Sequence, residues 1–147
     1  MKKIVVFVLL AVFVLSACAS APSTPQTNAE PASGEAPAGD ALFQIVKADG
    51  STFDVTLDAV KALPLAQLAA EGKVEEGPYL SDVLELAGVT EFAEVMLSGS
   101  SNPATLTYDQ VDENTILDFN NHGTMKLAST YIPKANWTKD VAQITVK

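Results

Sequence analysis

The stretch GPYLSDVLELAGV, residues 77–89, carries the clearest structural pattern in the chain. Its apolar positions follow the i, i+3, i+4, i+7 spacing of one helix face: Leu80, Val83, Leu84 and Ala87. Gly88 comes next, and glycine most readily takes the left-handed conformation that ends a helix. The stretch therefore predicts an amphipathic helix over 79–87 that ends at Gly88.

On the N-terminal side of this helix, the sequence predicts a hairpin and short helices. Strands are expected at 42–46 and 53–55, separated by the turn signal Ala-Asp-Gly. Thr56 is a suitable N-cap for a helix over 57–63, which a proline closes. Residues 65–71 are expected to continue as a further helical turn.

On the C-terminal side, strands dominate. The expected strands are 94–98, 104–108, 115–119, 125–132 and 141–146. A polar loop, 99–103, follows the first of them. Strands thus outnumber helices, and residues 41–147 are long enough for one core but too short for two. We expect a small single α+β domain with few helices.

Three segments resemble the sulfite-oxidase-like molybdopterin-binding domain. The first is TLDAVKALP (56–64), which is similar to the family's T-L-x-x-L-K-x-L-P. The second is the stretch 77–89, which is similar to G-V-P-L-x-D-L-L-x-x-A-G-V. The third is the closing part, YIP (131–133), Trp137 and VAQITV (141–146), which is similar to R-L-V-x-P … W-V-K-x-I-x-x-I-x-V. The resemblance covers most of the domain and implies a mixed-sheet fold. Much of the pattern is core and caps, so it speaks to fold more than to function.

The departures from this family concern its chemistry. In enzymes of the family a cysteine thiolate binds molybdenum, and arginines and histidines help to hold the pterin phosphate. This chain has one cysteine, Cys18, one histidine, His122, and no arginine. After Gly99 the family usually has S-D-G-Y, whereas SSNP stands here at 100–103. The resemblance therefore implies the scaffold without its catalytic apparatus, and no catalytic residue is carried over.

A candidate ligand cleft follows from the place where the family holds its pterin. It would lie near the loop 99–103 and the start of the helix at 79–87, and its candidate residues are Tyr79, Ser100, Ser101, Asn102 and His122. Hydroxyl and backbone amide groups there could bind a small polar ligand or an anion. The alternative is that the loop is merely solvated and that His122 is a turn residue.

The acidic residues do not form a metal motif. Asp109, Asp112, Glu113 and Asp118 lack the order of a calcium loop and are expected to form a solvated acidic face. Glu71, Glu75 and Glu76 are expected as exposed loop charge. We therefore expect no metal site.

The N-terminus has the features of a bacterial lipoprotein signal. Two lysines precede an apolar run, 4–15, that is shorter than the roughly 20 residues of a membrane-spanning helix. The following LSAC resembles a lipobox, which implies a signal peptide over 1–17 and acyl chains, palmitate among them, on Cys18. The alternative is an ordinary signal peptide with a coincidental cysteine.

Residues 18–40 and the charge complete the prediction. After the lipidated cysteine this segment is rich in Ala, Pro, Ser and Thr, without aromatic or large aliphatic residues, so we expect a disordered tether. The net charge is −9 and no arginine is present, which disfavours nucleic acid and anionic lipid headgroups as partners.

The sequence therefore predicts a lipid-anchored lipoprotein of the cell membrane or envelope, with its domain outside the cytoplasm. The domain is expected to be a non-catalytic module that binds a small ligand or an envelope protein, with no cofactor. The alternative is a molybdopterin-dependent oxidoreductase, or a redox accessory protein, that holds its cofactor without a cysteine ligand. A third possibility is a structural lipoprotein without a small ligand.

Overall fold

The computed structural model describes residues 40–147, so the expected signal peptide (1–17) and almost all of the tether (18–40), Cys18 included, lie outside the described residues. The strands are β1 (Ala41–Val46), β2 (Thr52–Thr56), β3 (Ala66–Ala70), β4 (Lys73–Gly77), β5 (Glu94–Ser98), β6 (Ala104–Thr107), β7 (Thr115–Phe119), β8 (Met125–Ser129) and β9 (Gln143–Val146). The helices are α1 (Leu57–Lys61) and α2 (Leu80–Leu86), with single 3₁₀ turns η1 (Tyr108–Gln110) and η2 (Lys134–Asn136). In this part of the chain, no helix has the length and apolar character needed to cross a membrane.

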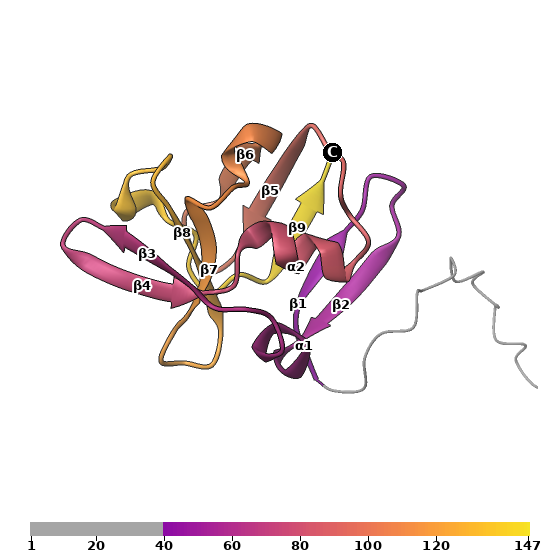
Figure 1. The fold of residues 1–147 in the computed structure, drawn as a ribbon. Helices are drawn as coiled ribbons and strands as arrows, with labels where there is room; N and C mark the ends of the chain where they lie inside the picture. Colours follow the sequence, from indigo (N-terminus) through magenta and orange to yellow (C-terminus); the bar gives the residue numbers. More distant parts are fainter. Residues whose placement is uncertain (1–39) are drawn as a thin grey trace, which may run out of the picture.

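A five-stranded sheet in the order β2-β1-β9-β5-β6 forms the body of the domain. β1 and β9 run parallel, whereas the neighbouring pairs are antiparallel, so the sheet is mixed. α2 lies against this sheet (Figure 1). It brings Leu80, Val83 and Leu84 into the main core. The expectation of an α+β domain with a mixed sheet and few helices is thereby confirmed.

The α2 segment follows the sequence pattern closely. Gly88 has a φ of +72°, which an L side chain rarely adopts. Its backbone N–H donates to the carbonyl of Glu85, and that of Val89 donates to Leu84. These two bonds satisfy carbonyls that a helix end would otherwise leave without partners. The predicted helix and its glycine terminus are both confirmed.

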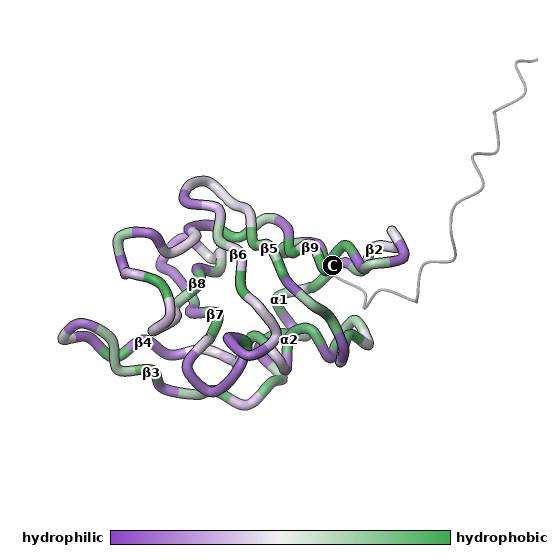
Figure 2. Tube along the Cα trace, turned by 90° about the horizontal axis from the view of Figure 1, so that it is seen from above, coloured by the Kyte–Doolittle hydropathy of each residue, from purple (hydrophilic) through white to green (hydrophobic). Residues whose placement is uncertain are grey.

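Two further hairpins, β3–β4 and β7–β8, pack on one another beside the main sheet. Figure 1 and Figure 2 both show the β3–β4 hairpin at the opposite end of the domain from the β1–β2 hairpin. A second, smaller core lies among the hairpins and consists of Leu68, Ile116, Ala128 and Trp137. β4 approaches β7 so closely that a Cβ on Gly77 would lie 1.9 Å from the carbonyl oxygen of Leu117. Glycine is therefore required at the junction of the hairpins.

The prediction of helix over 65–71 is wrong, because β3 occupies most of it. Glu71 and Gly72 connect β3 to β4 in a tight turn with φ values of +45° and +78°. The side chain of Leu68 reaches the second core, whereas its neighbours in β3 remain more exposed. Alternation of this kind is typical of a strand and overrides the helical propensity of the segment.

Candidate functional site

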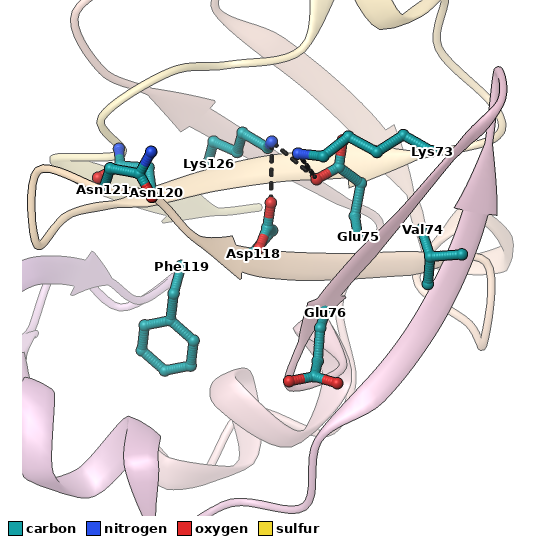
Figure 3. Close-up of a pocket in the computed structure, with 9 residues that line it drawn as sticks. All are labelled: Lys73, Val74, Glu75, Glu76, Asp118, Phe119, Asn120, Asn121 and Lys126. Carbon is teal, nitrogen blue, oxygen red and sulfur yellow. Dashed lines mark hydrogen bonds and ion pairs between the residues drawn. The ribbon is translucent and has the colours of Figure 1, made fainter.

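A charged pocket of about 380 Å³ opens where the two hairpins meet (Figure 3). Its lining residues are Lys73, Val74, Glu75, Glu76, Asp118, Phe119, Asn120, Asn121 and Lys126. β4 supplies the first four, and β7, β8 and the turn between these strands supply the rest. In Figure 3 Glu76 and Phe119 point away from the cluster of ion pairs, in which Lys73 and Lys126 both reach the same carboxylate.

Glu75 is that carboxylate, and it is buried, with 2% of its surface exposed. Its Oε2 accepts hydrogen bonds from Lys73 and Lys126, each at 3.0 Å. Its Oε1 accepts no hydrogen bond within residues 40–147 and lies 3.6 Å from the Nζ of Lys134. The expectation that Glu75 is exposed loop charge is therefore wrong: side chains alternate along β4, and that of Glu75 turns inward.

Lys126 connects Glu75 to a second buried carboxylate. Its Nζ lies 2.8 Å from Oδ2 of Asp118, which is 7% exposed. Asp118 therefore does not belong to a solvated acidic face, contrary to expectation, because the β7–β8 register pairs it directly with Lys126. Lys126 and Lys134 also lie 5.9 and 5.5 Å from the centroid of the Trp137 ring, at distances typical of cation–π contacts.

The proton affinities of this cluster differ from those of free side chains. Burial raises the pKa of Glu75, but its interactions with Asp118, Lys126 and Lys73 outweigh burial and lower its pKa to about 2. Burial raises the pKa of Asp118, and the neighbouring Glu75 adds to this increase against the effect of Lys126. As the pH falls, Asp118 is therefore the first of the two to take up a proton.

One predicted cleft residue, Ser100, and the turn that carries His122 meet at Asp140. The hydroxyl of Ser100 donates to Oδ2 of Asp140 at 2.6 Å. Thr124 and Asn120, which flank the His122 turn, donate to Oδ1 at 2.6 and 2.8 Å. The pKa of Asp140 is lowered by Ser100 and Thr124 first, and the charge of His122 adds to this. His122 itself is exposed, in a turn between β7 and β8, as the alternative reading expected.

The rest of the loop 99–103 is bound to the segment 135–139. Ser101 forms an isolated bridge with Lys139, and the side-chain amide of Asn102 donates to the carbonyl of Ala135 at 2.9 Å. A Cβ on Gly99 would lie 2.2 Å from the carbonyl oxygen of Lys139, so the backbones approach closely. The loop and this segment therefore hold each other by direct contact.

Tyr79 lies apart from these residues. It precedes α2, bridges to Ile116 and packs against the second core. The structure thus brings Ser100 and the His122 turn together around Asp140, keeps Ser101 and Asn102 nearby on the same loop, and leaves Tyr79 elsewhere. Ligand binding by the five residues stays a prediction.

Sequence reasoning missed Glu75 and Asp140 as organising residues. One signal was available for the first cluster: Asp118 and Lys126 stand at equal distances from the centre of the Asn-His-Gly turn, which predicts that they face each other across a hairpin. No local pattern indicated Asp140, because its partners come from distant loops.

The described residues do not fit a molybdopterin centre of the kind that the family resemblance implies. No cysteine lies in 40–147, and no group of three His, Cys, Asp or Glu side chains there could hold a metal ion. Three of the lysines, Lys73, Lys126 and Lys134, surround Glu75. A phosphate would have to compete with Glu75 for these cations.

Comparison with known proteins gives likenesses among solved structures. No family model and no curated protein matches the chain. Among solved structures, the chain is similar to the sulfane dehydrogenase SoxCD from Paracoccus pantotrophus, with 17% sequence identity and a TM-score of 0.53. The match covers 71% of this chain but only 37% of that chain. At this identity the likeness concerns the fold alone.

Proposed function

We propose that this chain is a lipid-anchored lipoprotein of the cell envelope whose extracytoplasmic domain is a non-catalytic binding module on a sulfite-oxidase-like scaffold. The scaffold is supported by the three sequence segments that resemble the family and by the likeness to the sulfane dehydrogenase. The module serves binding of a small ligand or an envelope protein.

This proposal rests on the hydrogen bonds that polar side chains form with one another within the domain. Ser100, Thr124 and Asn120 all donate to Asp140, and Lys73 and Lys126 donate to Glu75. Groups that could have held a cofactor or activated a nucleophile instead hold loops and hairpins together. A scaffold arranged in this way presents surfaces rather than a reaction centre.

Lipid anchoring rests on the sequence before the domain. The residues LSAC at 15–18 follow a short apolar run, and a proline-containing spacer separates them from β1. Acyl chains on Cys18 would supply membrane affinity that the acidic surface does not, since stable anchoring takes more than one chain.

The anchoring is tested by expressing the full chain and its Cys18→Ser variant in a bacterium with lipoprotein-processing enzymes. The wild type should enter the membrane fraction and yield an N-terminal peptide whose mass includes acyl chains on Cys18. The variant should lose both properties, whereas a neighbouring substitution, Ser20→Ala, should retain them. An unmodified cysteine in the wild-type membrane fraction would contradict the proposal.

The absence of catalysis is tested by metal and pterin analysis of the chain purified from its native host. The likeness to a sulfane dehydrogenase favours a second candidate, a redox protein that holds its cofactor without a cysteine ligand. Molybdenum or tungsten with pterin near one per chain, or a visible absorption band lost on reduction, would establish that candidate. Protein without metal and pterin supports the binding module.

A further inference from the structure

A second, differently built cavity borders α2 and shares no lining residue with the charged pocket. This aromatic groove, of about 250 Å³, is lined by Ser81, Leu84, Glu85, Val89, Thr90, Phe92, Tyr108, Asp109, Val111 and Asp112. Its walls are largely apolar: the rings of Phe92 and Tyr108 lie 5.1 Å apart between centroids and are tilted by 59°. Tyr108 is nevertheless 54% exposed, so its ring remains open to a partner.

The rim of the aromatic groove carries only negative charge. Glu85, Asp109 and Asp112 line it, and no lysine does. Within residues 40–147, the ion pairs all involve Glu75 or Asp118, so none neutralises the rim. Burial raises the pKa of Asp112, but hydrogen bonds from Tyr131 and Asn114 outweigh it and lower the pKa, which keeps this carboxylate ionised.

The volume of the groove suits a single side chain better than a whole small-molecule ligand. Pockets for small-molecule ligands usually measure roughly 300–1,000 Å³, and this one is smaller. A single lysine or arginine side chain suits it, because such a side chain can lay its methylene stem on apolar walls while its cation stays near carboxylates. An arginine can additionally stack on an aromatic ring.

We propose that the aromatic groove binds one arginine or lysine side chain from a basic segment of a partner protein. This inference rests on the proposed binding function and names its partner class. The charge of the chain favours the same partner, because a net charge of −9 attracts cationic surfaces and speeds their encounter.

The experiment titrates the full chain, purified in a non-ionic detergent, with a Gly-Ser-Arg-Ser-Gly peptide and follows backbone amide NMR shifts. A matched peptide with citrulline replaces the cation by a neutral isostere. Shifts should concentrate in residues 84–92 and 108–112, and the citrulline peptide should bind about three- to fivefold more weakly. Raising the salt concentration should weaken binding of the arginine peptide only.

Variants test the two parts of the groove. Tyr108→Ala and Asp109→Asn should each weaken binding of the arginine peptide about three- to fivefold. Asp58→Asn removes a carboxylate from the first turn of α1, outside the groove, and should leave binding unchanged. Equal binding of both peptides, or shifts confined to the charged pocket, would overturn the proposal. So would free argininamide that binds as tightly as the peptide, since the partner would then be a small organic cation.

The outcomes are separable from those of the proposed function. A chain that carries acyl groups and no pterin but ignores the arginine peptide would refute the aromatic groove alone. A chain that carries stoichiometric pterin would refute the non-catalytic module, whatever its affinity for the peptide.

Discussion

The charged pocket and the aromatic groove both contain carboxylates, but they use them differently. In the charged pocket, Glu75 and Asp118 are buried and paired with lysines. In the aromatic groove, Glu85 and Asp109 are exposed and none of the ion pairs in residues 40–147 includes them. Charge that is paired internally contributes to the fold, whereas charge left at an apolar opening remains available to a partner.

The difference follows from what each region must hold together. The aromatic groove borders the main core, which α2 and the five-stranded sheet stabilise without charges. The second core, beside the two hairpins, consists of four buried hydrophobic residues, three from the hairpins and Trp137. The Glu75 cluster adds contacts among β4, β8 and Lys134, and a buried pair of this kind also fixes one register of packing.

Removal of the Glu75 carboxylate should lower the free energy of unfolding more than the other changes proposed below. Glu75→Gln leaves three lysines close together around a site that no longer carries a negative charge. Breaking a buried ion pair typically costs about 3–5 kcal/mol, and we expect a loss near the lower limit because Asp118 still pairs with Lys126. Denaturant titration of the domain measures this loss.

The neighbouring Glu76→Gln variant is the matched control. Glu76 is exposed and should change the free energy of unfolding by less than about 0.5 kcal/mol. Similar losses for the two variants would mean that the cluster is no more important than surface charge.

A single methyl group added at the junction of the hairpins should destabilise the fold. In Gly77→Ala the new Cβ meets the backbone of Leu117, which no rotamer change can relieve, so we expect a loss of about 2–3 kcal/mol. Gly72→Asn, in the turn of the same hairpin, meets no atom within 4 Å, and asparagine tolerates a positive φ. It should therefore cost less than about 1 kcal/mol, and thermal unfolding of both variants checks the contrast.

The charged pocket should also make stability depend on pH. Because the folded-state pKa of Glu75 is lowered from its usual 4.5 to about 2, its contribution is present above pH 4.5 and is lost as the pH falls towards 2. The raised pKa of Asp118 acts in the opposite direction. One proton gives at most about 1.4 kcal/mol per pH unit.

Variants distinguish the contributions of Glu75 and Asp118 to the pH dependence of stability between pH 2 and 4.5. Glu75→Gln should flatten the acid limb of the curve of unfolding free energy against pH, and Asp118→Asn should steepen it. Acid limbs of identical slope in the wild type and in Glu75→Gln would contradict the assignment of this titration to Glu75.

Local sequence patterns predicted the parts of the fold that local interactions determine. The helix before Gly88 and the Thr56 cap were recognisable because spacing and capping residues act within one turn. The strand β3 was not, because AQLAA has good helix formers and only its packing between β4 and the second core makes it extended. Its turn, Glu71-Gly72, also lacks the Asn-Gly signal typical of such hairpins.

The sites were predictable to a smaller degree. The loop at Ser100 and the turn at His122 could be chosen from the family resemblance and from their polar residues, and both lie beside Asp140. Asp140 itself, like the meeting of Glu75 with Lys134, depends on contacts between residues far apart in the chain. Single-sequence patterns carry no information about such distant pairs.

The smallest effect should come from the rim of the aromatic groove. Glu85 lies in the last turn of α2, where the negative end of the helix dipole opposes a carboxylate. Glu85→Lys should therefore raise the free energy of unfolding by about 0.3–0.5 kcal/mol, while its cation repels the arginine peptide. Asp82→Lys, in the first turn of the same helix, should lower the free energy of unfolding by a similar amount. The two variants should therefore change the free energy of unfolding in opposite directions, whereas peptide binding should weaken more in Glu85→Lys. This pattern would distinguish the effect of the helix dipole on stability from the effect of the groove on binding, because Asp82 does not line the groove.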